Sequence, residues 1–120
     1  VEDVLKAAKL LGAENIPCDV YKLVMIFPFP DVLIREIMRY DVVLMAEECI
    51  ACGGIGEHLE MALQHAGWNG RYIHTAVEQL CLPHATVPQI KQVTGLDAEH
   101  LAQAVREAVQ APEAKGEAKV

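Results

Sequence analysis

The residues best suited to chemistry gather in one short stretch, Met45–Leu63, which reads MAEECIACGGIGEHLEMAL. Cys49 and Cys52 have the spacing of thiols that ligate zinc or form a redox pair. Three glycines follow, and backbone amides in a glycine loop before a helix can bind an anion. Glu47 and Glu48 precede both features. The stretch therefore raises three alternatives: a metal or redox site, an anion-binding loop, or the tight bend of an α/β fold.

A metal site at Cys49 and Cys52 lacks the rest of its ligands. Structural zinc is held by four side chains, and the sequence has no second Cys-x-x-Cys and no His-x-x-x-His. A redox pair of the thioredoxin type places its second cysteine inside the helix, whereas here Gly53 and Gly54 follow directly. The pattern favours ordinary loop cysteines and leaves Cys49 and Cys52 as weak metal candidates. The histidines show no ligand spacing beyond a pair seven residues apart, and they are His58, His65, His74, His84 and His100.

The glycine loop matches neither the dinucleotide fingerprint nor the P-loop. No Lys or Arg occurs between Arg39 and Arg71, and carboxylates surround the loop, which disfavours phosphate. Close packing of a helix against a sheet is the favoured role of these glycines, because glycine has no Cβ. Serine is absent and no nucleophile–base pair stands out, so no catalytic residue is predicted. The residues of the remaining candidate, an anion or interface loop, are Glu47, Glu48, Gly53, Gly54 and Gly56.

Strands alternate with helices along the chain, which predicts an α/β fold with three layers and a mostly parallel sheet. Apolar periodicity predicts helices at 2–12, 31–40 and 55–66, and strands at 20–27, 41–46 and 71–77. Two further helices follow, one after the capping box of Thr86 and Gln89 and one after Asp97. This organisation predicts one domain over residues 1–110 and a flexible tail over 111–120.

Three strands make a thin sheet for so many helices, and the chain opens on a helix rather than a strand. We therefore expect one or more N-terminal strands to lie upstream of Val1 or to come from another chain. Without them an exposed sheet edge should recruit a partner strand.

Composition excludes several classes of protein. The net charge is −7 with a pI of about 5.1, which argues against a nucleic-acid surface. No apolar run reaches the roughly 18 residues of a membrane helix. The start of the chain is not a signal peptide, and its four cysteines form no disulfide framework. A cytoplasmic protein is expected.

Four segments together resemble the C-terminal domain of transketolase-like, thiamine-diphosphate-dependent enzymes. They are VYKLVMIFPFPDVLIREI, DVVLMAEECIACGGIGEHLEMAL, HATVPQIKQVTGL and GLDAEHLAQAV. The last two are most similar to the 1-deoxy-D-xylulose-5-phosphate synthase branch of that family. The departures are Phe27 for the family's Lys, Pro30 for Asp, Ala85-Thr86 for Gly-Ser, and residues 76–79 for Gly-Leu-Pro-Asp.

The resemblance implies a non-catalytic C-terminal domain of a larger synthase that joins pyruvate to glyceraldehyde 3-phosphate with loss of CO2. It implies that thiamine diphosphate and Mg2+ are bound by the preceding domains, and that this domain serves packing and formation of a homodimer. The alternative from the residues alone is a free-standing regulatory module that binds a small anion or a nucleotide.

Overall fold

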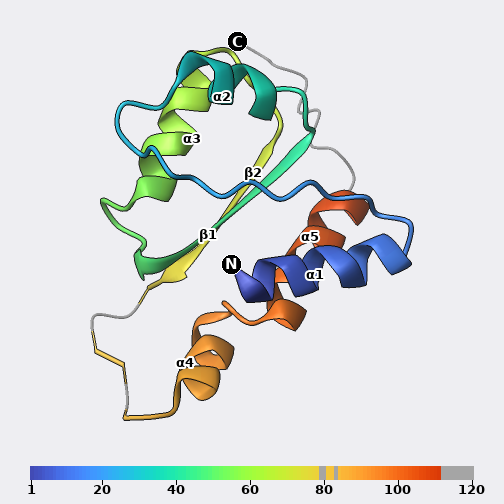
Figure 1. Cartoon of the computed structure of the whole chain (residues 1–120), viewed down its shortest axis with the longest axis vertical. Helices are drawn as coiled ribbons and strands as arrows, with labels where there is room; N and C mark the ends of the chain where they lie inside the picture. The colour runs from blue at the N-terminus through green and yellow to red at the C-terminus, as the bar shows by residue number, and fades with distance from the viewer. Residues whose placement is uncertain (79–80, 83, 112–120) are drawn as a thin grey trace.

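The computed structural model describes residues 1–78, 81–82 and 84–111, which include helices and two parallel strands (Figure 1). The sheet consists of β1 and β2, and helices surround it. In chain order the elements are α1 (Glu2–Ala13), α2 (Asp31–Ile37), β1 (Val42–Ile50), α3 (Ile55–His65), β2 (Arg71–Val77), α4 (Val87–Thr94) and α5 (Ala98–Gln110).

The two strands run parallel, as the alternation of strands and helices predicts. Val42 pairs with Arg71, and the register holds to Ala46 opposite Thr75 before an irregularity. β2 has the predicted bounds, whereas β1 continues four residues past the predicted end at residue 46. The second half of β1 therefore carries the polar residues that the sequence assigned to a loop.

The predicted strand at residues 20–27 is wrong for the described part of the chain, where the sheet has only β1 and β2. This segment is extended coil, and Val24 and Phe27 are 87% and 84% exposed. A β-branched, apolar run favours a strand, but a strand also needs the backbone of a neighbour with which to pair. No described segment provides that neighbour. Residues 20–27 therefore have the apolar, β-branched composition of a strand but do not join the sheet.

Local sequence signals set most of the helix ends. Thr86 precedes α4, and its backbone N–H donates to Oε1 of Gln89 at 3.0 Å, one half of the predicted capping box. Gly95 ends α4 with φ at +73°, a left-handed conformation that glycine adopts readily. Asp97 caps α5, as predicted. Helix α2 stops at Ile37, three residues before the predicted end, and a tight turn leads from there to Tyr40.

Alternate side chains of β1 contact two different apolar clusters. Leu44 and Ala46 contact a cluster formed by α1 and α5, whereas Val43 and Met45 contact a cluster formed by α2 and α3. This alternation follows from the period of two in a strand. Figure 1 shows α1 beside α5 and α2 beside α3. The buried members of the clusters are Ala7, Leu11, Leu101 and Ala102 in the first, and Ile37, Leu59 and Leu63 in the second.

Ion pairs join α1 to the two C-terminal helices. Nζ of Lys91 in α4 lies 2.6 Å from Oδ2 of Asp3 in α1, and both side chains are largely shielded from solvent. Arg106 in α5 donates two hydrogen bonds to the carboxylate of Glu14, at 2.8 and 2.7 Å. These pairs hold the N-terminal helix against the rest of the chain.

Removing Lys91 should raise the pKa of Asp3. The hydrogen bond from Lys91 holds that pKa below its ordinary value of 3.8, so the pair stabilises the fold above about pH 4. The contribution is lost as the pH falls through the depressed pKa. We expect Lys91→Met to return the pKa to the ordinary range and to lower the stability of the fold slightly at pH 7. Carboxyl NMR titration measures the shift; Lys9→Met, on the exposed side of α1, is the control, and an unchanged Asp3 titration in Lys91→Met would refute the pairing.

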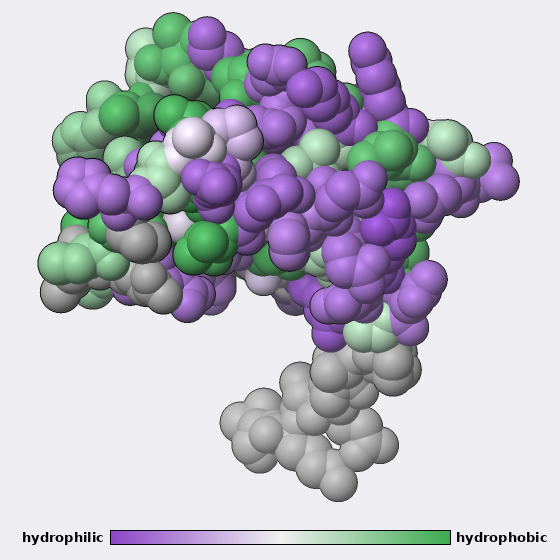
Figure 2. All heavy atoms as spheres, turned by 90° about the horizontal axis from the view of Figure 1, so that it is seen from below, coloured by the Kyte–Doolittle hydropathy of each residue, from purple (hydrophilic) through white to green (hydrophobic). Residues whose placement is uncertain are grey.

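The described helices include none that is both long and apolar enough to span a membrane. Figure 2 shows that hydrophilic residues dominate the face of the molecule seen from below, the side on which α4 lies in Figure 1.

Candidate functional site

The side chain of Glu47 points from β1 to the first turn of α3. The N–H of Ile55 donates to its Oε2 at 3.2 Å, and the N–H of Gly56 donates to its Oε1 at 3.0 Å. The residue before α3 is Gly54, which has no side chain with which to cap the helix. A carboxylate from the neighbouring strand therefore takes over the capping role, where the helix dipole stabilises negative charge.

His74 of β2 completes this arrangement. Its Nε2 lies 2.6 Å from Oε1 of Glu47, and the side chains of His74 and Glu47 are only 14% and 9% exposed. The strands bring them together because Met45 pairs with His74, which places Glu47 two residues further along β1. We define the Glu47–His74 cluster as these two side chains and the amides of Ile55 and Gly56, which donate hydrogen bonds to Glu47.

Tyr72 lies two residues before His74 on the same strand and also points at α3. Its hydroxyl donates to the carbonyl oxygen of Gly56 at 2.8 Å. Burial raises the pKa of Tyr72 well above its ordinary value, and the nearby charges of Glu60 and Glu47 raise it further. The phenol therefore stays protonated and acts as a donor that fixes the helix against the sheet.

The glycines at the start of α3 allow the helix to approach the side chain of His74 and the end of β1 closely. A Cβ at Gly56 would overlap the imidazole of His74, and one at Gly54 would lie 2.7 Å from the carbonyl oxygen of Ile50. Gly53 has φ at +75°, and its N–H donates to Oε2 of Glu57 at 2.7 Å. The N–H of Gly54 donates to the carbonyl oxygen of Ala51. The amides of residues 53–56 are thus all engaged by the chain itself.

This geometry disfavours an anion at the loop. An anion would have to displace Glu47 and Glu57 from the amides and then meet their negative charge. Glu48 points to solvent and takes no part in the Glu47–His74 cluster. Of the candidate loop residues Glu47, Glu48, Gly53, Gly54 and Gly56, the structure joins all but Glu48 into the bend between β1 and α3.

Cys49 and Cys52 are both exposed as free thiols. The described residues contain no group of three or more His, Cys, Asp or Glu side chains that could hold a metal ion. Cys49 lies near the end of β1 and Cys52 in the turn that follows.

A polar cavity of about 370 Å³ lies at the carboxyl end of β2, where α/β folds commonly bind ligands. His74 and Thr75 line it from the strand, and Thr94 and His100 from the helical side. His100 is held by its contact with Asp97, the cap of α5. The cavity holds polar groups but no nucleophile paired with a base among the residues that the structure describes.

His74 is the residue of the cluster that ligand spacing among the histidines does not reveal. A signal was available in the strand at 71–77, where Tyr72 and His74 share one face at a spacing of two. Two polar aromatic side chains on one face of a buried strand need hydrogen-bond partners. The pairing of β1 with β2 supplies these partners at the start of α3.

Comparison with known proteins finds the family that the sequence motifs resemble. The family model described as "Transketolase, C-terminal domain" matches residues 1–101. The 1-deoxy-D-xylulose-5-phosphate synthase of Thermotoga petrophila is 30% identical over 105 residues, which cover 85% of this chain and 17% of that protein. The enzyme of the same name from Thermotoga maritima shows the same identity and coverage.

A less similar relative matches a slightly larger share of the chain. The 1-deoxy-D-xylulose-5-phosphate synthase of Aquifex aeolicus is 27% identical over 110 residues, or 91% of this chain and 18% of that protein. The chain thus spans about a sixth of the length of the curated relatives it matches.

Proposed function

Because the chain belongs to the transketolase C-terminal domain family, we propose that it is the C-terminal domain of a longer 1-deoxy-D-xylulose-5-phosphate synthase. The observation that carries this proposal is the coverage: 85% of the chain matches 17% of a synthase. The proposed reaction of the whole polypeptide joins pyruvate to glyceraldehyde 3-phosphate and releases CO2.

The proposal assigns thiamine diphosphate and Mg2+ to the preceding domains, because the residues of this chain do not fit them. Glu47 occupies the amides that could receive a diphosphate, and carboxylates surround the loop. The described residues also offer no group of acidic, histidine or cysteine side chains for a metal. No chemical step is therefore assigned to this chain, and its role is packing and formation of a homodimer.

A strip of exposed apolar side chains supports the packing role. Consecutive residues 24–27 are exposed, and so is Val32 in the first turn of α2. Large exposed apolar patches on soluble proteins mark contact surfaces. The members of the strip are Val24, Met25, Ile26, Phe27 and Val32.

The test of the function uses the whole natural polypeptide that carries this chain. Supplied with thiamine diphosphate, Mg2+, pyruvate and glyceraldehyde 3-phosphate, it should release CO2 and form 1-deoxy-D-xylulose 5-phosphate, which mass spectrometry identifies. Omission of either substrate should abolish the product. A polypeptide that releases no CO2 from pyruvate with this acceptor would overturn the proposal.

The proposed homodimer has a matched pair of test variants. Val32 lies in the first turn of α2 and is 70% exposed, and Val87 lies in the first turn of α4 and is 66% exposed. Aspartate suits the N-terminus of a helix, so neither variant should disturb folding. Val32→Asp should weaken the dimer of the whole polypeptide at least about tenfold, because it places a charge in an apolar contact. Val87→Asp should leave it unchanged, and light scattering that finds equal association in both would exclude the strip from the interface.

A further inference from the structure

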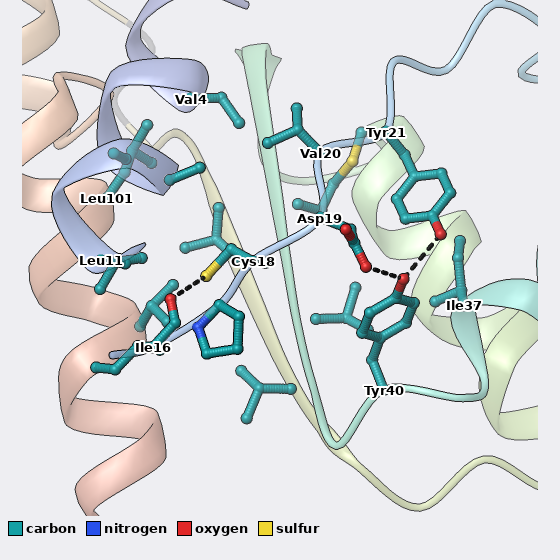
Figure 3. Close-up of a pocket in the computed structure, with 18 of the residues that line it drawn as sticks. Val4, Leu11, Ile16, Cys18, Asp19, Val20, Tyr21, Ile37, Tyr40 and Leu101 are labelled. Atoms are coloured by element: carbon teal, nitrogen blue, oxygen red, sulfur yellow. Dashed lines mark hydrogen bonds between the residues drawn. The ribbon is translucent and has the colours of Figure 1, made fainter. Parts of the chain in front are cut away.

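The proposed packing role leaves the Cys-x-x-Cys pair, Cys49 and Cys52, without a use. Both thiols are exposed. Among the hydrogen bonds of the described residues, none involves the Sγ of either cysteine. The Sγ of Cys18, by contrast, donates to the carbonyl oxygen of Ile16 at 3.5 Å (Figure 3). The pair can therefore react without the loss of a hydrogen bond that holds the bend between β1 and α3.

The backbone bends between the two thiols. Three extended residues span roughly 10 Å, whereas a disulfide needs Cα atoms about 4.4–6.8 Å apart. The chain bends at Ala51, and the N–H of Gly54 donates back to the carbonyl oxygen of Ala51 at 3.2 Å. Cys52 and Gly53 are the central residues of this turn, and Gly53 has φ at +75°, as some turn types require at the third position. The turn therefore shortens the span from Cys49 to Cys52 toward the range of a disulfide.

The surroundings of the pair favour a disulfide over a metal centre. A closed zinc site needs four side chains, and the described residues include no group of three or more His, Cys, Asp or Glu that could hold an ion. An exposed thiol with a second thiol close by is the arrangement that reversible oxidation selects, because the second thiol resolves the first oxidised product. In a reducing compartment such a bond is transient and responds to oxidant.

We propose that Cys49 and Cys52 form a reversible disulfide by exchange with a small-molecule disulfide of the glutathione type. The thiolate of one cysteine attacks the S–S bond of the acceptor, forms a mixed disulfide and releases one thiolate. The second cysteine then attacks the mixed disulfide, closes the Cys49–Cys52 bond and releases the other half of the acceptor. The two cysteines lose two electrons and two protons, and the acceptor is reduced to two thiols.

Trypsin separates the cysteines of this chain in a way that suits the test. Cys49 and Cys52 share the tryptic peptide of residues 40–71, which has no internal Lys or Arg and no other cysteine. Cys18 and Cys81 fall in other peptides. The whole polypeptide is treated with glutathione disulfide, its remaining thiols are blocked with N-ethylmaleimide, and the tryptic digest is analysed by mass spectrometry.

The mass of peptide 40–71 decides the result. Its main form should be two hydrogens lighter than the dithiol and should carry neither N-ethylmaleimide nor glutathione. Dithiothreitol added before the blocking step should restore two reactive thiols. A main form that carries two blocking groups, glutathione on either cysteine, or a link to another peptide would overturn the inference. The readout is a mass and not an activity, so this result is independent of the proposed function.

Two matched variants assign the bond to the pair. Cys52→Ser removes one of its thiols, so no form of the peptide should lose two hydrogens, and Cys49 should carry glutathione or the blocking group. Cys18→Ser removes a cysteine outside the pair and should leave the yield of the Cys49–Cys52 disulfide unchanged. Both substituted positions are exposed, so neither change should disturb folding. Equal loss of the disulfide in the two variants would contradict the assignment.

Discussion

Glu47→Ala should make the amides of α3 exchange with solvent about 100-fold faster, because it lowers the free energy of local opening by about 3 kcal/mol. The substitution removes the acceptor of the Ile55 and Gly56 amides and the partner of His74. Glu47 is nearly buried, so little water is available to replace its oxygens. Native-state hydrogen exchange in the whole polypeptide measures the effect.

Glu48→Ala is the matched control, since Glu48 is the next residue in β1 and points to solvent. It should change the opening free energy by less than about 0.5 kcal/mol. Glu47→Gln, which keeps the shape and one acceptor but loses the charge, should fall between the two. Equal effects of Glu47→Ala and Glu48→Ala would contradict the capping role of Glu47.

Gly56→Ala should destabilise the same region by about 2–3 kcal/mol, which is large for the addition of one methyl group. The new Cβ would overlap the imidazole of His74, which must then leave its position 2.6 Å from Glu47. Both the packing of α3 and the Glu47–His74 contact are lost together. Exchange of the α3 amides in the whole polypeptide measures this change.

The control for Gly56→Ala is Gly12→Ala in α1, where a Cβ meets no atom within 4 Å. That substitution should stabilise α1 by about 0.5–1 kcal/mol, because alanine favours helix. A second substitution, His74→Ala, should reduce the cost of Gly56→Ala by at least about 1 kcal/mol, because it removes the overlapping ring. If the two effects simply add, the overlap with His74 is not the cause.

Local signals in the sequence predicted most of the fold. The apolar spacing of α3, Thr86 before α4, and Asp97 before α5 all act within a few residues, so their outcomes depend little on the rest of the chain. The parallel pairing of β1 and β2 also follows from the helix that must connect them.

The strand expected at residues 20–27 shows where local reasoning ends. Its apolar, β-branched residues are suited to a sheet, but pairing depends on a neighbour that composition cannot supply. An apolar groove of about 380 Å³ lies between the first part of this segment and β1 (Figure 3). Residues 20–27 thus have the composition of a strand, but the described residues give them no strand with which to pair.

The Glu47–His74 cluster could not be predicted for a related reason. Both residues were visible in the sequence, but their 2.6 Å contact depends on the register of β1 against β2. The same register decides that Glu47 turns inward while Glu48 turns outward. Glu47, one of the residues named for an anion or interface loop, instead caps α3 by accepting from the amides of Ile55 and Gly56.

We propose that this chain supports a synthase without entering its chemistry. The most direct test is the kcat/KM for pyruvate of the whole polypeptide carrying Glu48→Ala, with glyceraldehyde 3-phosphate as acceptor. Glu48 is the exposed carboxylate at the end of β1 where α/β folds place functional groups, and its removal should not disturb packing. We predict kcat/KM within about twofold of the unaltered polypeptide; a loss of about tenfold or more would correspond to 1.4 kcal/mol of transition-state stabilisation and would contradict the claim.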